Sequence, residues 1–555
     1  MLKGRGFFDS SGLDTLTLLL FLAIVAGGIA AAFCVFSGLD PYYDDTFYVF
    51  YAYQLLSGNL TFMVNAFSYS FLNLAPIAVS FALFGYNTYS AILPSVVEYA
   101  LLMFIAMMVA RRLYGRTFAA IGTVLVATAP FLTMYITRAL PDINIGLAVA
   151  LSISLFLLSV RRGTRILAVA SGVAAAYTIY VKNVAFLYLA LFIIANLIAY
   201  RGAFLTHKYK SGRGHVKASK ARYALLGNLG ITFLCIAIGL FLYMLVFYLS
   251  AGNPLFPFIN YGTSPAVLPP LQEVYLLVKP YYSYSGLGLN SNFELFSLGP
   301  IAILAVIGTA IGIYRKNSNI NYLSFFNWAI FAYLIFGTST IHGYVPVPTV
   351  SRFFAIIAMP LAVLGGYAMY HMYRAAKAVL RNKTLVMAAF VLLIVAMELS
   401  YIPVYKMFTY YASWIYGSRN EFVSAAAYIG NATRGQNVSV YVNAPEDGLL
   451  LDGLYYTNFS VSFSKSFRLY SVASVAYYSN STVVVDGSRA CNDTIGNNAY
   501  LLDIGSTESP YATSHERGNM YGWLGNNCTA EQVSSFLGSD TAPFKIFLYK
   551  INYIA

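Results

Sequence analysis

The sequence predicts a polytopic α-helical membrane protein of about eleven transmembrane helices, followed by a small extracytoplasmic α/β domain. Of the 555 residues, 59% are hydrophobic and 10% are charged, whereas soluble domains average about 25% charged residues. Apolar runs of about 20 residues recur up to residue 403, and each can cross a hydrocarbon core of about 30 Å. We therefore divide the chain into a membrane domain, residues 1–403, and a C-terminal domain, residues 404–555.

Basic residues predict how the helices are oriented. Residues 1–403 contain 25 of the 34 Lys and Arg, but only 10 of the 21 Asp and Glu. Short basic clusters separate pairs of apolar runs, as cytoplasmic loops do. This pattern puts the N-terminus in the cytoplasm, loops 37–87 and 251–294 outside, and residues 404–555 outside. The expected helices cover residues 14–36, 88–110, 117–136, 143–160, 166–181, 184–200, 223–250, 295–314, 322–340, 352–373 and 384–403. The basic excess therefore indicates membrane lipid rather than nucleic acid as a partner.

Glycosylation sequons give an independent indication of this topology. Six of them fall in the C-terminal domain, at Asn431, Asn437, Asn458, Asn480, Asn492 and Asn527. A seventh, at Asn59, lies in the first outer loop, and one at Asn382 lies on an expected inner loop. Single sequons occur by chance, but this distribution agrees with the charge pattern. It predicts a plasma-membrane protein of a glycosylating host, such as an archaeon.

The outer segments carry their own local patterns. Residues 46–56 suit an interfacial helix, and the apolar run 71–84 is short enough to be re-entrant or interfacial. In the C-terminal domain, Ser418 and Glu421 form a helix-capping pair. Strand-like runs follow at 438–442, 482–485, 500–504 and 544–549. Cys491 and Cys528 can form a disulfide if this domain is outside the cytoplasm.

Most of the few carboxylates in the membrane domain map to its outer side. The densest group follows the first helix and contains Asp40, Asp44 and Asp45. Ionisable groups near membrane depth usually face a polar cavity, and one of two adjacent carboxylates can act as a general base. The alternative is a solvated loop with incidental acids. Asp142 is the second outer acid; it is either catalytic or the N-cap of the next helix.

The outer side also contains a few cations that oppose the positive-inside trend. Arg138, Lys182 and Arg352 are the candidates for binding a phosphate, which arginine can grip with two parallel hydrogen bonds. The alternative is that they form ion pairs with Asp44 or Asp142. His342, near Arg352 in the sequence, is an additional candidate, although a lone histidine in a loop is usually structural. The sequence has no His/Cys cluster suited to zinc, and we expect no cofactor.

Several short motifs occur in a recognisable order. Asp44-Asp45 is followed by a helical stretch and Gly58, then by Phe84-Gly85 and by Arg111-Arg112-Leu113-Tyr114-Gly115. Gly252-Asn253-Pro254-Leu255-Phe256-Pro257 and the segment from Arg352 to Pro360 come later. This order resembles the GT-C superfamily of membrane glycosyltransferases, closest to the branch of protein O-mannosyltransferases and lipid A aminoarabinose transferases. The chain departs from the pattern at Asp45, where Glu is usual, and at Ile92, where Arg is usual; residues 404–555 carry no signature.

The resemblance implies a polyprenyl- or dolichyl-phosphate sugar as donor, with a hexose such as mannose, and a protein, glycan or lipid as acceptor. It implies that Asp44 orients or deprotonates the acceptor hydroxyl, that Lys182 and Arg352 hold the lipid phosphate, and that transfer inverts the anomeric carbon.

Two other function classes compete with this prediction. Asp40-Pro41-Tyr42-Tyr43 resembles the first-loop motif of oligosaccharyltransferases, but the Trp-Trp-Asp signature of that class is missing. A lipid or polysaccharide transporter is the non-enzymatic alternative. Transporters often have pseudo-repeated halves, which this sequence lacks, and Glu98 is its single mid-membrane acid.

Overall fold

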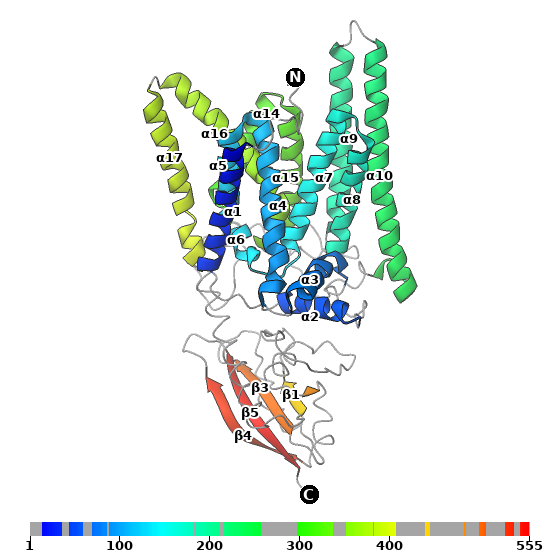
Figure 1. Ribbon diagram of the computed structural model, residues 1–555, viewed down its shortest axis with the longest axis vertical. Helices are drawn as coiled ribbons and strands as arrows, with labels where there is room; N and C mark the ends of the chain where they lie inside the picture. The colour runs from blue at the N-terminus through cyan, green and yellow to red at the C-terminus, as the bar shows by residue number, and fades with distance from the viewer. Residues whose placement is uncertain are drawn as a thin grey trace.

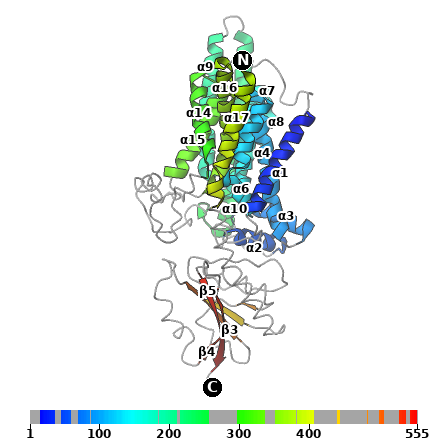
Figure 2. The same cartoon turned by 90° about the vertical axis from the view of Figure 1, so that its left-hand side faces the viewer.

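The computed structural model describes residues 14–35, 44–58, 69–85, 88–182, 185–210, 215–256, 297–336, 351–380, 382–406, 439–443, 482–483, 499–506, 528–537 and 544–553. These residues form a bundle of long helices, two short helices at one end of it, and a β-sheet (Figure 1). The sheet lies beyond the end of the bundle that carries α2, α3 and α6, as both views show (Figure 2).

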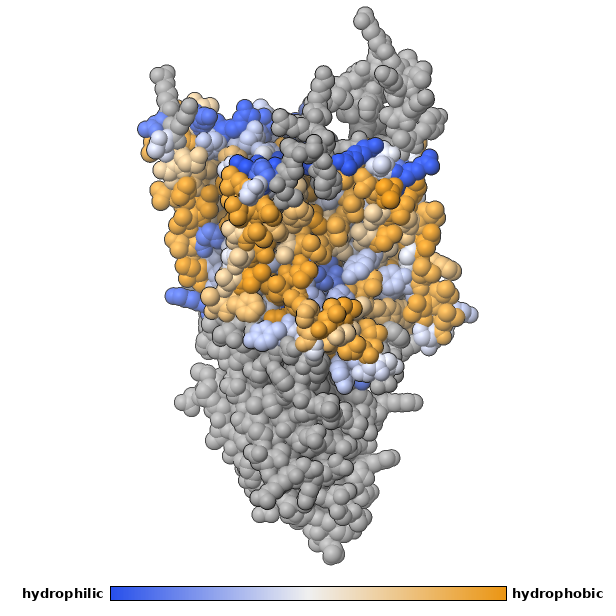
Figure 3. Space-filling view, viewed as in Figure 1, coloured by the Kyte–Doolittle hydropathy of each residue, from blue (hydrophilic) through white to orange (hydrophobic). Residues whose placement is uncertain are grey.

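A helix occupies each of the eleven segments that the sequence assigns to the membrane. These are α1 (Thr15–Val35), α4 (Thr88–Tyr114), α5 (Arg116–Ala127) with α6 (Pro130–Ile136), α7 (Asp142–Arg162), α8 (Arg165–Val181), α9 (Phe186–Lys210), α10 (His215–Ala251), α14 (Pro300–Tyr314), α15 (Ser318–Phe336), η2 (Ser351–Ile357) with α16 (Ala358–Val379), and α17 (Lys383–Leu399). Figure 3 shows a broad hydrophobic band across the visible face of the bundle, with hydrophilic residues along its upper edge. The chain is a multi-pass membrane protein.

The expected number of eleven spans is not confirmed. Among the described residues, six helices are long and apolar enough to cross a membrane, or seven if one bent pair is a single span. That pair is α5 and α6, which meet at 67° where the sequence predicts one straight helix over 117–136. Pro130 begins α6 and has no N–H to donate to the preceding turn, so the helix ends at Ala127 and restarts in a new direction.

The centre of the bundle is packed closely enough to require glycine. A Cβ atom on Gly122 of α5 would meet the carbonyl oxygen of Ala362 and the backbone of Gly366, both on α16. The Tyr114 hydroxyl at the end of α4 donates to the Val363 carbonyl at 2.9 Å. Small residues thus bring helix backbones together where lipid offers no hydrophobic driving force.

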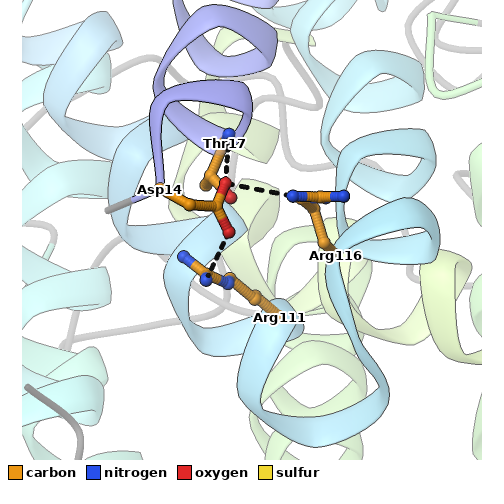
Figure 4. A network of polar contacts seen from close by, with 4 residues as sticks. All are labelled: Asp14, Thr17, Arg111 and Arg116. Atoms are coloured by element: carbon orange, nitrogen blue, oxygen red, sulfur yellow. Dashed lines mark hydrogen bonds and ion pairs between the residues drawn. The ribbon is translucent and has the colours of Figure 1, made fainter. Parts of the chain in front are cut away.

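The basic end of the bundle fixes the start of the first helix. Asp14 precedes α1 and accepts hydrogen bonds from Arg111 at 3.2 Å and Arg116 at 3.0 Å, which lie at the α4–α5 junction (Figure 4). The Thr17 backbone N–H also donates to Asp14, at 2.7 Å. At the same end, the side chain of Asn382 accepts from the N–H groups of Thr384 and Leu385 and so caps α17. This sequon residue therefore has a structural role.

Two short helices lie at the opposite end. α2 (Asp44–Leu56) and α3 (Phe71–Phe84) cover the two apolar segments predicted in the first outer loop. α3 packs against α2, α4 and α8. The pair therefore links the connection between α1 and α4 to the ends of the long helices.

The C-terminal strands form one mixed sheet in the order β2-β1-β3-β5-β4. β1 (Ser439–Asn443) runs parallel to β2 (Thr482–Val483) and β3 (Ala499–Ser506), whereas β5 (Phe544–Tyr553) is antiparallel to β3 and β4. Four strands coincide with predicted runs. The sequence missed β4 (Cys528–Leu537), a polar edge strand with a bulge between Gln532 and Ser534. The helix expected after Ser418 lies outside the described residues.

Candidate functional site

The ends of several helices bring charged side chains together at the α2–α3 end of the bundle. Asp45 comes from the first turn of α2, Arg138 from the α6–α7 connection and Asp142 from the first residue of α7. Lys182 ends α8, and Arg352 lies in η2. They form two groups of buried or half-buried ion pairs.

The first group is the pair between Asp45 and Arg138. The guanidinium Nε of Arg138 donates to Asp45 Oδ2, and the Asp45 side chain has no exposed surface. The Ser95 hydroxyl of α4 donates to the Arg138 carbonyl oxygen at 2.6 Å and so fixes the connection that carries the arginine. A carboxylate this deeply buried needs its partner, because an unpaired buried charge is strongly destabilising.

The second group is centred on Asp142. Lys182 Nζ donates to Asp142 Oδ1 at 3.1 Å, and Arg352 Nε lies 3.8 Å from Asp142 Oδ2. Pro141, rather than Asp142, is the N-cap residue of α7, so of the two alternatives for Asp142 the capping role is wrong. The side chain instead points to neighbouring elements. An acid at the start of α7 and a cation at the end of α8 also have the signs that helix dipoles favour.

An aromatic ring lies close to both cations of this group. Lys182 Nζ is 4.3 Å from the centroid of the Phe353 ring, and the Arg352 guanidinium carbon is 5.5 Å from it. Cations are attracted to the face of an aromatic ring. Phe353 therefore holds both cations beside Asp142, a role that charge counting along the sequence does not reveal.

A small pocket opens beside this group, with a cavity volume of about 30 Å³. Lys182 and Asp142 provide its charged groups, and aliphatic and aromatic side chains form most of the remaining wall. The wall is made by Ile145, Ala185, Leu187, Tyr188, Leu191, Ile330, Tyr333, Leu334, Phe353 and Ile356. The lining thus combines a buried cation with apolar side chains, which is the chemistry that an anionic group next to an apolar chain requires.

The charge balance of the site favours an anion. Three cations, Arg138, Lys182 and Arg352, face two carboxylates, Asp45 and Asp142. The described groups therefore have a net charge of +1, and the excess lies in the Asp142 group, which holds two cations. Removed from bulk water, such an excess attracts a phosphate more strongly than an exposed one would.

Five of the residues that the sequence singled out are ion-paired in the structure. Two of them, Asp142 and Lys182, also line the pocket. Asp44 begins α2, but its side chain lies outside the described part of the chain, as do Asp40, His342 and Cys491. Cys528 begins β4, and its side chain is likewise not described. Among the described residues, no three His, Cys, Asp or Glu side chains could hold a metal ion together.

Comparisons with known proteins agree with this architecture. Residues 71–215 match the profile of the family described as dolichyl-phosphate-mannose-protein mannosyltransferase. Crystal structures of ArnT from Cupriavidus metallidurans match over 97% of this chain and 98% of theirs, with a TM-score of 0.54 at 15% identity for the form bound to undecaprenyl phosphate. The chain has the fold of the GT-C glycosyltransferases. The apo form of ArnT gives a TM-score of 0.53 at 14% identity.

The other comparisons are weaker. The oligosaccharyltransferase AglB from Archaeoglobus fulgidus, in complex with an inhibitory peptide and a dolichol-phosphate, matches over 88% of this chain and 70% of its own. Its TM-score is 0.47 and its identity 12%. No curated protein sequence matches the chain.

Proposed function

We propose that this GT-C protein transfers a sugar from a polyprenyl- or dolichyl-phosphate donor to an acceptor hydroxyl at the α2–α3 end of the bundle. The observation that carries the proposal is the buried Lys182, which lies with Asp142 in the wall of an apolar pocket. The apolar wall suits the isoprenoid chain, and Lys182 and Arg352 suit the phosphate. Mannose is the first sugar to test, because the matched family is described by mannosyl transfer.

The cations have a definite role in this reaction. The acceptor oxygen attacks the anomeric carbon, the bond from that carbon to the phosphate oxygen breaks, and its electron pair stays on the lipid phosphate. The phosphate thus gains a second negative charge as it leaves. Pre-organised cations that meet this developing charge lower the barrier, and Lys182 and Arg352 are already held in place by Asp142 and Phe353.

The proton of the acceptor hydroxyl goes to a carboxylate on the opposite face of the sugar, so that the configuration inverts. We assign this role to Asp44, the first residue of α2. Its neighbour Asp45 is fully buried against Arg138 and is better suited to fixing the start of α2. Asp142 lies in the pocket wall and holds the cations.

The remaining expectations belong to the same proposal. Basic residues would place the Asp14 end of the bundle in the cytoplasm and the α2–α3 end outside. Residues 404–555, which follow α17, would then be an extracytoplasmic domain on the acceptor side. A protein, glycan or lipid acceptor remains compatible with this placement.

The test is sugar transfer by purified protein in liposomes. Polyprenyl-phosphate mannose and polyprenyl-phosphate glucose are supplied with mixed peptide and lipid acceptors, and wild type is compared with Asp44→Asn. Asp14→Asn, at the opposite end of the bundle, is the control. We expect transfer by wild type and by the control, and a large loss in Asp44→Asn.

Other outcomes have specific meanings. Equal transfer by wild type and Asp44→Asn would move the base to Asp45 or Asp142. If wild type transferred neither sugar to any acceptor but moved the lipid across the bilayer, the protein would be a transporter and this proposal would be wrong.

A further inference from the structure

A proline in α3 leaves one backbone carbonyl without its usual helical partner. In a regular helix the N–H of residue 76 would donate to the carbonyl of residue 72, but residue 76 is Pro76, inside α3. Proline has no N–H, so the Leu72 oxygen is open to other donors. Such freed carbonyls in membrane proteins are commonly satisfied by side chains of neighbouring helices.

Two such donors reach the Leu72 carbonyl from separate helices. The Asn144 amide of α7 donates to it at 3.2 Å, and the Tyr177 hydroxyl of α8 donates to it at 3.0 Å. Asn144 is buried, and Tyr177 is half-buried. One oxygen of α3 therefore joins α7 and α8 at a single point.

These donors lie close in sequence to the charged groups of the site. Asn144 is on the first turn of α7, which begins with Asp142, and Tyr177 is on the last turns of α8, which ends before Lys182. α3 in turn packs against α2, which carries Asp44 and Asp45. The Leu72 carbonyl thus connects the α2–α3 pair, which carries Asp44 and Asp45, to the ends of α7 and α8, where Asp142 and Lys182 lie.

We propose that Tyr177 and Asn144 are positioning residues, which fix the place of α2 and α3 relative to α7 and α8 through the Leu72 carbonyl. They thereby place the Asp44–Asp45 segment relative to the pocket that contains Asp142 and Lys182. The catalytic consequence rests on the function proposed above. The structural consequence, a tie between α3 and the bundle, does not depend on it.

The arrangement predicts which step of the reaction depends on these residues. The pocket wall comes from α7, the α8–α9 connection, α9, α15 and η2, and the described lining contains no α3 residue. Loss of the Leu72 contacts would leave donor binding in that pocket intact. It would displace the α2 carboxylates, so the chemical step would slow, because small misplacements of reacting groups reduce rates strongly.

The test compares Tyr177→Phe and Asn144→Ala with a matched control, Tyr180→Phe. Tyr180 lies three residues further along α8, and its hydroxyl donates to the Gly239 carbonyl of α10 at 2.6 Å. Each Tyr→Phe change removes one hydroxyl from α8 that bonds a backbone carbonyl of another helix. Of these two hydroxyls, the one on Tyr177 bonds to α3 and the one on Tyr180 bonds to α10.

The first readout is amide hydrogen exchange of the purified full-length protein, which requires no sugar transfer. We expect exchange in peptides from 44–56 and 71–84 to rise several-fold in Tyr177→Phe and Asn144→Ala. Tyr180→Phe should leave both regions unchanged. Unchanged exchange in both test variants, or an equal rise in Tyr180→Phe, would overturn the proposal.

The second readout is steady-state transfer from polyprenyl-phosphate mannose. We expect kcat to fall about tenfold in Tyr177→Phe with KM for the donor within about twofold of wild type. A rise in KM with unchanged kcat would show that Tyr177 supports the pocket itself, and would refute the positioning role. Absence of transfer in wild type, with the exchange result as expected, would refute the proposed function while leaving the tie between α3 and the bundle intact.

Discussion

Lys182 donates a 3.1 Å hydrogen bond to Asp142 across the ends of two neighbouring helices, and both side chains are almost completely buried. The Lys182–Asp142 pair has two functions. It neutralises charges that would be costly inside the protein, and it keeps an ammonium group at the wall of an apolar pocket. Substitutions can separate these two functions.

Lys182→Met should reduce both stability and transfer. Among the described residues, the change leaves Asp142 with only the more distant Arg352. Breaking a buried pair typically costs about 3–5 kcal/mol. Loss of one stabilising group in the transition state typically costs about 10²–10³-fold in kcat. The double variant Lys182→Met/Asp142→Asn should regain thermal stability without regaining transfer. Recovery of transfer in the double variant would contradict a direct role of the ammonium group. Lys377→Met, at an exposed lysine of α16, is the control.

Asp45→Glu should destabilise the protein, although glutamate is the residue that the family resemblance leads one to expect here. The Asp45 side chain has no exposed surface and already contacts Arg138. An extra methylene in such a site typically costs about 1–3 kcal/mol. Thermal unfolding measures the loss, with Asp14→Glu, whose side chain is half-exposed, as the control. If the melting temperature equalled that of wild type, the site beside Arg138 would accommodate an extra methylene, and the close packing inferred here would be wrong.

Asp14→Asn should change how stability depends on pH. Hydrogen bonding by Thr17, followed by the interaction with Arg116, lowers the pKa of Asp14 below its ordinary value of 3.8. A carboxyl group with a lowered folded-state pKa stabilises the fold above its unfolded pKa, and this contribution is lost as pH falls through the folded-state pKa. The stability difference between wild type and Asp14→Asn should therefore be constant near neutral pH and shrink below about pH 4. A difference that grows on acidification would refute the assignment.

Gly122→Ala should destabilise the bundle, whereas Gly27→Ala should not. Alanine is favoured over glycine in helices by about 1 kcal/mol, so both changes would stabilise an unobstructed helix. At Gly122 the new Cβ would meet backbone atoms of α16, whereas at Gly27 it would meet no described atom of a neighbouring element within 4 Å. We expect a lower melting temperature for Gly122→Ala and an equal or higher one for Gly27→Ala. Equal melting temperatures would mean that α5 and α16 can separate without cost.

Local patterns in the sequence were sufficient to locate most helices. Long apolar runs predicted a helix in each of the eleven segments, and α2 and α3 follow from the patterns of residues 46–56 and 71–84. The break between α5 and α6 was missed because the run 117–136 is apolar throughout. Pro130 interrupts the backbone without interrupting that hydrophobicity. β4 was missed because its polar residues lack the alternation that marks a strand.

The sequence predicts which charged residues belong to the site, but not which of them pair with one another. Charged residues are rare enough on the predicted outer side to stand out individually. The sequence singles out Asp45, Arg138, Asp142, Lys182 and Arg352 in this way. Which of them form pairs depends on the order of helices around the bundle. Phe353, Ser95 and Tyr177 gave no signal, because an aromatic or hydroxyl side chain in an apolar segment is ordinary until its neighbours are known.

By itself, the sequence determined the membrane class, the places of the helices and the short set of charged residues. These depend on hydrophobicity, charge and backbone chemistry, which are local properties of the chain. Only the tertiary structure decided that Asp142 holds Lys182 rather than capping α7, that Arg138 pairs with Asp45, and that the carbonyl freed by Pro76 bonds to α7 and α8. Each of these contacts joins residues that lie 40 or more positions apart, or on different helices. Their distances are set by helix packing, which no local pattern encodes.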